Sequence, residues 1–141
     1  MHPDFPILEG YQQLRDDWSI NLPIQFNRRV DDGSLVFWRS GITVWVNAYG
    51  NNNHEKIGDR LQWIRNETSA SAKNINIQEN ATLTKYTYRL EEKRGDHSIF
   101  ALYSYAISLK GHIQIAIYLD AEQDFQVAQQ ISSSISHDCT N

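Results

Sequence analysis

Hydrophobic and polar residues alternate along several stretches of the chain, a period of two that predicts half-buried β-strands. In residues 18–22 the apolar side chains alternate with Ser and Asn, and Pro23 is expected to end this strand. Two further strands are predicted at 35–39 and 42–49. A short glycine-containing link separates them, which indicates a β-hairpin.

The second half of the chain carries the same alternation over longer stretches. Strands are predicted at 75–77, 82–91, 99–109 and 113–119. Polar or glycine-containing turns, at Lys93-Arg94-Gly95-Asp96 and Lys110-Gly111, separate the last three. Consecutive strands with such short links pair antiparallel, so this half is predicted to form an antiparallel meander.

Two segments change to the helical period. Residues 54–68 carry an apolar stripe, and Asn52 with Glu55 fits a capping box at its start. A second amphipathic helix is predicted after Asp120, with Gln123 as the partner in the box. The apolar stripes of the two helices are made by Ile57, Leu61 and Ile64, and by Phe125, Ala128, Ile131 and Ile135.

This order of elements predicts a single α+β domain at 18–135, with an N-terminal arm at 1–17 and a flexible tail at 136–141. A twisted antiparallel sheet needs cover on at least one face, and the two helices are the available cover. We therefore expect an α/β/α sandwich in which both helices pack on the sheet. The length of 141 residues agrees with one domain.

Composition narrows the classes of function. Apolar residues make up 40% of the chain and charged residues 21%, as in folded globular proteins. The net charge of −4 disfavours a general nucleic-acid binder, which needs a basic surface. It also disfavours a protein that binds anionic membranes, and no apolar run approaches the roughly 20 residues of a transmembrane helix.

The residues near the two ends of the sequence give an indication of the cellular compartment. The first residues have neither a basic region nor an apolar run, so no signal peptide is predicted. The single cysteine, Cys139, lies in the polar tail, where we expect a free thiol without a catalytic role. These features favour a cytoplasmic protein.

Catalytic, cofactor and metal motifs are missing from the sequence. There is no GxSxG, Walker or GxGxxG motif, and the histidines do not have metal-ligand spacing. Adjacent acidic pairs such as Asp31-Asp32 fall in expected turns, where solvation explains them. We therefore predict that the chain has no catalytic, cofactor-binding or metal-binding site and is not an enzyme.

The aromatic residues, 4 Trp, 7 Tyr and 5 Phe, are the more informative feature. Several of them, including Trp45 and Tyr118, alternate with the most apolar stripe of their own strand. Phe100 and Leu102 alternate in the same way with Ile99 and Ala101. Because large exposed apolar patches are uncommon, cover of both faces, by one helix each, is the favoured interpretation. The alternative is a partner-binding face rich in Trp and Tyr.

The segment Trp18-Ser19-Ile20-Asn21-Leu22-Pro23, then a hairpin, a helix, a long meander and a closing helix ending Gln130-Ile131-Ser132-Ser133-Ser134-Ile135, resembles the PsbP-like fold family. The resemblance is one of element order over 18–135. It implies a mostly non-catalytic protein, such as an accessory factor, an adaptor or a chaperone of a secreted effector. The Trp-rich hairpin at 37–46 departs from the usual pattern of the family.

Three hypotheses about function follow. The leading one is a cytosolic protein-binding module, such as an immunity protein that neutralises a basic toxin, or an effector chaperone. The second is a small-molecule-binding protein with a pocket lined by Tyr86, Tyr88, Tyr103 and Tyr105. The third is a homodimeric structural subunit. For the leading hypothesis, the predicted partner-binding residues are Asp31, Asp32, Trp38, Trp45, Tyr49, Phe100 and Leu102.

Overall fold

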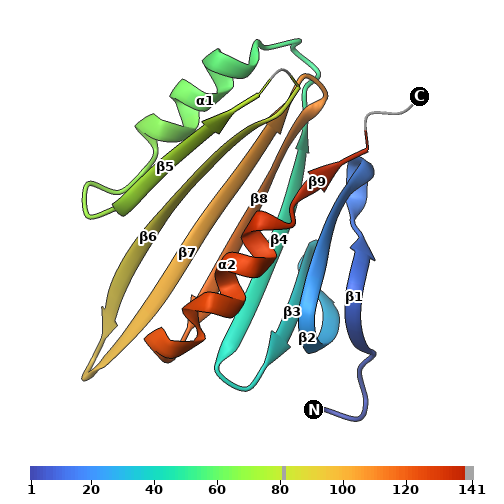
Figure 1. Cartoon of the computed structure of the whole chain (residues 1–141), viewed down its shortest axis with the longest axis vertical. Helices are drawn as coiled ribbons and strands as arrows, with labels where there is room; N and C mark the ends of the chain where they lie inside the picture. Colours follow the sequence, from blue (N-terminus) through green and yellow to red (C-terminus); the bar gives the residue numbers. More distant parts are fainter. Residues whose placement is uncertain (81, 139–141) are drawn as a thin grey trace.

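The computed structural model describes residues 1–80 and 82–138, and its main feature is one large antiparallel sheet (Figure 1). Eight strands lie in the order β1-β2-β3-β4-β8-β7-β6-β5, and β9 pairs with β2. The strands span Ile7–Gln13 (β1), Trp18–Asp31 (β2), Ser34–Arg39 (β3), Ile42–Gly50 (β4), Lys73–Glu79 (β5), Thr84–Arg94 (β6), His97–Ser108 (β7), Gly111–Leu119 (β8) and Ser136–His137 (β9).

Two short α-helices pack on this sheet, α1 at Ile57–Asn66 and α2 at Phe125–Ser133. The 3-10 turns η1 (Arg15–Asp17) and η2 (Glu122–Asp124) precede β2 and α2. In Figure 1, α2 lies across the middle of the sheet and α1 lies beside β5 and β6. Within the described part of the chain, neither helix has the length and apolar character needed to cross a membrane.

The strand register shows that the two helices lie on opposite faces of the sheet. Ser104 of β7 bonds to Ser132 of α2, whereas its neighbour Tyr105 belongs to the cluster under α1. Successive side chains of a strand point to opposite faces, so each directly paired residue can be assigned to one face. We call these the α2 face and the α1 face.

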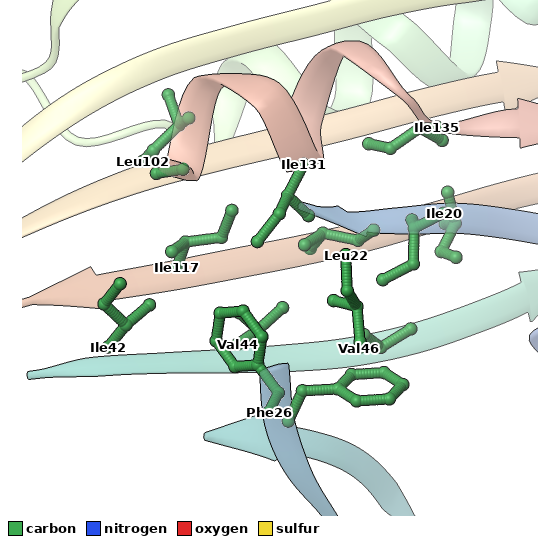
Figure 2. Close-up of a cluster of buried hydrophobic side chains, with 14 of the residues drawn as sticks. Ile20, Leu22, Phe26, Ile42, Val44, Val46, Leu102, Ile117, Ile131 and Ile135 are labelled. Atoms are coloured by element: carbon green, nitrogen blue, oxygen red, sulfur yellow. The ribbon is translucent and has the colours of Figure 1, made fainter. Parts of the chain in front are cut away.

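The main core fills the α2 face. Figure 2 shows how side chains from β2, β4, β7, β8 and α2 meet there. Val44 and Ile117 form a cross-strand pair on this face and are fully buried, as is Ile131 of the helix. The first half of β2 lies against α2, because the Asn21 amide donates to Ser134 Oγ at 2.8 Å. Helix α2 thus packs on β2, β7 and β8.

A smaller core lies on the α1 face. Leu61 and Ile64 of α1 pack on Tyr86, Tyr88 and Ile107 of the sheet. The Tyr86 hydroxyl bonds to Thr68 Oγ1, just after the helix, at 2.9 Å. Cover by α1 is therefore concentrated on β6 and β7.

The expected α+β architecture, a PsbP-like α/β/α sandwich, is wrong. Strands account for 56% of the described residues and helices for 18%. The helices have 10 and 9 residues, and a 10-residue helix is only about 15 Å long. Neither helix can form a full layer over a sheet of nine strands, although they do lie on opposite faces as expected.

The N-terminal region is part of the sheet, although residues 1–17 are expected to form an arm. Residues Ile7–Gln13 form the edge strand β1 along β2. Strand β2 also continues through Pro23, which is expected to end it. Leu8 pairs with Phe26 and Gly10 with Leu22, so Pro23 lies in a bulge where no ladder amide is required.

Other boundaries shift by a few residues. The start of α1 is organised by Asn51, whose Oδ1 accepts from the Glu55 amide at 2.8 Å, rather than by the expected Asn52. At the other helix, η2 intervenes between Asp120 and α2. Ser136–His137, expected in the tail, forms β9, while Cys139 lies outside the described residues. The expected turn at 31–33 is confirmed: Asp32 and Gly33 have φ of 50° and 86°.

Candidate protein-docking surface

Four aromatic side chains cluster on the α1 face, beside the part that α1 covers, and one of them, Tyr103, also packs against the cluster under α1. Trp45 of β4 pairs with Ala116 of β8, which pairs in turn with Tyr103 of β7. One row along, Trp38 of β3 pairs with Thr43, and Thr43 pairs with Tyr118. These four aromatic residues are all partly exposed, and we call Trp38, Trp45, Tyr103 and Tyr118 the aromatic patch.

Hydrogen bonds between side chains hold one side of the patch. The Tyr103 and Tyr118 hydroxyls lie 3.0 Å apart, and Tyr103 donates to Glu92 Oε1 at 3.3 Å. Glu92 also pairs with Arg94, at 3.6 Å. Burial, followed by the hydrogen bond with Tyr118 and the nearby carboxylate of Glu92, raises the pKa of Tyr103 far above its ordinary value. Tyr103 is therefore a neutral donor throughout the physiological range.

The other side of the patch is held by the N-terminal segment. The Phe5 ring contacts Trp38 edge-on, with centroids 5.0 Å apart, and the Arg29 guanidinium lies 4.5 Å from the Trp38 ring centroid. Asn27, which is fully buried, bonds through its amide to the backbone of His2, Phe5 and Pro6. These contacts fix the orientation of Trp38.

A shallow cleft of about 550 Å³ opens beside Trp45 and Tyr118. Arg29 and Arg94 line it together with Asp120. Arg29 also pairs with the half-exposed Asp31, at 3.7 Å. The cleft therefore combines two aromatic walls with an excess of one positive charge among its lining residues.

A buried polar contact marks the end of β4 and anchors α1. Arg60 of α1 donates to His112 Nδ1 at 3.1 Å and to the Gly50 carbonyl at 3.0 Å. Its second nitrogen donates to Glu55 Oε1 at 3.2 Å. Burial and the Arg60 charge lower the pKa of His112 to about 4. Tyr49, which is stacked on His112 at 4.8 Å, lies at this end of the face.

The structure brings together some of the predicted partner-binding residues and separates others. Trp38, Trp45 and Tyr49 share the α1 face, and Asp31 and Asp32 lie at the exposed end of the β2–β3 hairpin. Phe100 and Leu102 point to the α2 face instead, where they pair with Leu119 and Ile117. Leu102 is only 5% exposed, so it belongs to the core and not to a surface shared with Trp45.

Tyr103 and Tyr118 complete the patch but are missing from the predicted set of partner-binding residues. Tyr118 occupies the face opposite to the core side chains of β8, whereas Tyr103 shares its face of β7 with the buried Ala101 and Ile107. Finding them requires the register between β4, β8 and β7, which the sequence does not contain. The four tyrosines of the expected ligand pocket, Tyr86, Tyr88, Tyr103 and Tyr105, share the α1 face and pack in one cluster, where Tyr88 stacks on Tyr103 at 5.1 Å.

Among residues 1–80 and 82–138, no group of three or more His, Cys, Asp or Glu side chains is arranged to hold a metal ion. The buried pair of Arg60 and His112 is engaged in anchoring α1, as described above. The aromatic patch therefore presents ring faces, hydroxyl donors and arginines, which are groups suited to contact with another molecule.

No family model matches the chain, and no curated protein matches it. Among solved structures, the chain is similar to a crystal structure of a protein from Bacteroides thetaiotaomicron VPI-5482, with a TM-score of 0.67 and 12% sequence identity. The match covers 92% of this chain and 48% of that one, so this chain spans about half the length of the solved chain. At this identity the likeness shows a shared fold.

Proposed function

We propose that this chain is a non-catalytic protein-binding module that docks its partner on the aromatic patch. The observation that supports this proposal is the grouping of four partly exposed Trp and Tyr rings on adjacent strands. Trp and Tyr are enriched among the residues that dominate binding energy at protein interfaces. Trp38, Trp45 and Tyr118 lie on β3, β4 and β8, outside the part of this face that α1 covers, and Tyr103 of β7 links them to the cluster under α1.

The rigidity of the patch favours binding. Trp38 is fixed by Phe5 and Arg29, and Tyr103 by Tyr118 and Glu92. Side chains that are already ordered lose little conformational entropy when a partner docks. The backbone beneath these side chains is held by the hydrogen bonds of the antiparallel sheet.

The charges around the patch indicate the chemistry of the partner. Arg29 and Arg94 line the cleft beside Trp45, against one carboxylate, Asp120. The fitting partner segment therefore inserts an apolar or aromatic side chain between Trp45 and Tyr118 and presents hydrogen-bond acceptors to the arginines. Arg29 and Arg94 are themselves paired with Asp31 and Glu92, so the patch offers arginine donors without an excess of positive charge.

The test compares Trp45→Ala with Tyr11→Ala in the full chain. Tyr11 is an aromatic residue on the edge strand β1, 66% exposed and distant in the sheet from the patch, so it is a matched control. Tagged wild-type and variant proteins are used to capture partners from the native lysate. Each captured protein is then purified, and its binary affinity is measured by calorimetry.

We expect Trp45→Ala to weaken the complex by about 30-fold, which corresponds to the roughly 2 kcal/mol of an interface hot spot. Tyr11→Ala should leave the affinity unchanged. Equal affinities for wild type and Trp45→Ala would place the partner elsewhere and refute the choice of surface. A captured second copy of the chain would instead indicate a homodimer.

A further inference from the structure

A groove on the α2 face is independent of the aromatic patch. It lies between α2 and the strands β5 and β6, and has a volume of about 320 Å³. This is within the range of cavities that bind small molecules. Most of its lining is polar, from Asn74, Asn76, Gln78, Lys85, Thr87, Arg89, Gln129, Ser132 and Ser133, and the apolar residues are Leu102 and Phe125.

The alternation of β6 explains why this part of the α2 face is polar. Lys85, Thr87 and Arg89 pair with Ala106, Ser104 and Leu102 of β7, so all three point to the same face as the main core. Helix α2 covers β7 and β8 but not β6 and β5. The groove therefore runs along α2, with β5 and β6 forming its other side. The apolar residues Leu102 and Phe125 are buried, at 5% and 7% exposure, and form the apolar part of the groove lining.

Both cations of the groove are held in place by their neighbours. Lys85 Nζ donates to the Ser133 carbonyl, near the end of α2, at 3.2 Å. Burial lowers the pKa of Lys85 from its ordinary value. The Arg89 guanidinium lies over the Phe125 ring, 3.2 Å from its centroid, and reaches Glu122 at 4.0 Å. The distant, mostly exposed Glu122 leaves Arg89 with donors to offer a ligand.

The charge of the groove contrasts with that of the whole chain. The chain has a net charge of −4, yet the residues that line the groove include two cations and no carboxylate. Carboxylates, Glu91 and Glu122, enter only in an adjoining cavity of about 230 Å³, which shares Asn74, Arg89 and Phe125 with the groove. The groove itself therefore favours an anion.

The amides of β5 add a second kind of recognition. Asn74, Asn76 and Gln78 occupy alternate positions of β5, and each amide offers donors and an acceptor together. This combination suits hydroxyl groups, which also donate and accept. Asn74 has a φ of 54° at the bulge between Lys73 and Asn76, a conformation that asparagine tolerates better than most residues.

We propose that this groove binds a small polyhydroxylated anion, such as a sugar phosphate or a sugar acid. The anionic group lies at Arg89, and the hydroxyls contact the β5 amides and Thr87, with Lys85 at the far end. Lys85 and Arg89 are four residues apart on one strand, a separation of about 13 Å at 3.3 Å per residue. A single sugar ring with one charged substituent fits within this length.

The test is calorimetry on the full chain at low ionic strength with four probes: glucose 6-phosphate, glucuronate, glucose and inorganic phosphate. We expect glucose 6-phosphate or glucuronate to bind at least tenfold more tightly than glucose or phosphate. The stronger of the two distinguishes a phosphorylated ligand from a carboxylated one. Failure of both to bind at millimolar concentration, or equal binding of inorganic phosphate, would overturn the proposal.

Variants locate the binding. Arg89→Gln should weaken the complex by about tenfold or more, because a charge-assisted hydrogen bond is lost. Lys85→Met, which keeps the alkyl stem, should weaken it to a smaller extent. Arg28→Gln removes an exposed arginine of β2 and serves as the control. Equal loss in Arg28→Gln and Arg89→Gln would show nonspecific charge attraction and refute the site.

Two further variants separate structural effects from binding effects. Arg89→Lys keeps the cation, so it should retain part of the affinity if Arg89→Gln proves too unstable to measure. Trp45→Ala changes the opposite face and should bind the probes like wild type. A failure of this proposal is thereby distinguishable from a failure of the proposed protein-docking function.

Discussion

His112 provides the sharpest quantitative prediction, because it is a buried neutral histidine in contact with a cation. It is 5% exposed, and its Nδ1 accepts a hydrogen bond from Arg60 at 3.1 Å. Protonation of Nδ1 would break this bond and bring two positive charges together, with Glu55 the nearby carboxylate that acts in the opposite direction. The pKa of His112 in the folded protein is therefore lowered to about 4.

The sign of the effect on stability follows from this shift. The pKa of an ordinary histidine is 6.5, so between pH 6.5 and 4 the unfolded chain binds a proton that the folded chain rejects. The free energy of unfolding is therefore highest above pH 6.5 and decreases as the pH falls toward 4. At 1.36 kcal/mol per pKa unit, the full contribution of His112 is about 3 kcal/mol.

Urea unfolding of wild type and His112→Gln at pH 7.5 and pH 4.5 measures this contribution. Carboxylates titrate in both proteins, so their effect cancels in the difference between them. We expect wild type to lose about 2.5 kcal/mol more than His112→Gln between the two pH values. An equal loss, or an NMR titration of the His112 ring with a midpoint near 6.5, would refute the reasoning.

Other predictions follow from the core and from two glycines. Ile131→Ala should lower the free energy of unfolding by about 3 kcal/mol in urea titrations, because it leaves a cavity between α2 and the sheet. Gly111 has a φ of +144°, and an added Cβ would collide with the Tyr49 carbonyl oxygen, so Gly111→Ala should destabilise by more than 2 kcal/mol. Gly58→Ala, in open space within α1, should instead stabilise by about 0.5–1 kcal/mol in the same assay.

Strands with short links were predictable from the sequence. The hairpin of β3 and β4 and the meander of β6, β7 and β8 follow the alternation of apolar and polar residues, which depends only on local geometry. The continuation of β2 through Pro23 was not predictable, because it depends on a bulge opposite Gly10 in another strand. Strand β1 was missed for a related reason: it is an edge strand whose alternating residues are mostly polar or exposed.

The predicted arrangement of helices and sheet in layers was wrong. Amphipathic patterns correctly indicated two helices, and opposite faces were the favoured expectation. The patterns could not show that helices of 10 and 9 residues would cover only part of a sheet of nine strands.

The candidate site was partly predictable. Trp38 and Trp45 were among the residues expected on a binding face, and Trp45 alternates with the core residues Val44 and Val46 of its own strand. Phe100 and Leu102 show the same alternation, yet the register places them in the α2 face. The pairing register decides which face of a strand lies beside which face of its neighbour. The groove near Arg89 was not predictable from the sequence, because its polar side chains resemble those of a solvated strand face.

The central claim is that partners dock on the aromatic patch, and site-specific photo-crosslinking in the native cells tests it most directly. A benzophenone amino acid replaces Thr43, between Trp38 and Tyr118, or Gln126, which is exposed on α2. We predict a discrete crosslinked partner from position 43 that disappears with Trp45→Ala, and no such product from position 126. Equal products from both positions, or a product that persists in Trp45→Ala, would contradict the claim.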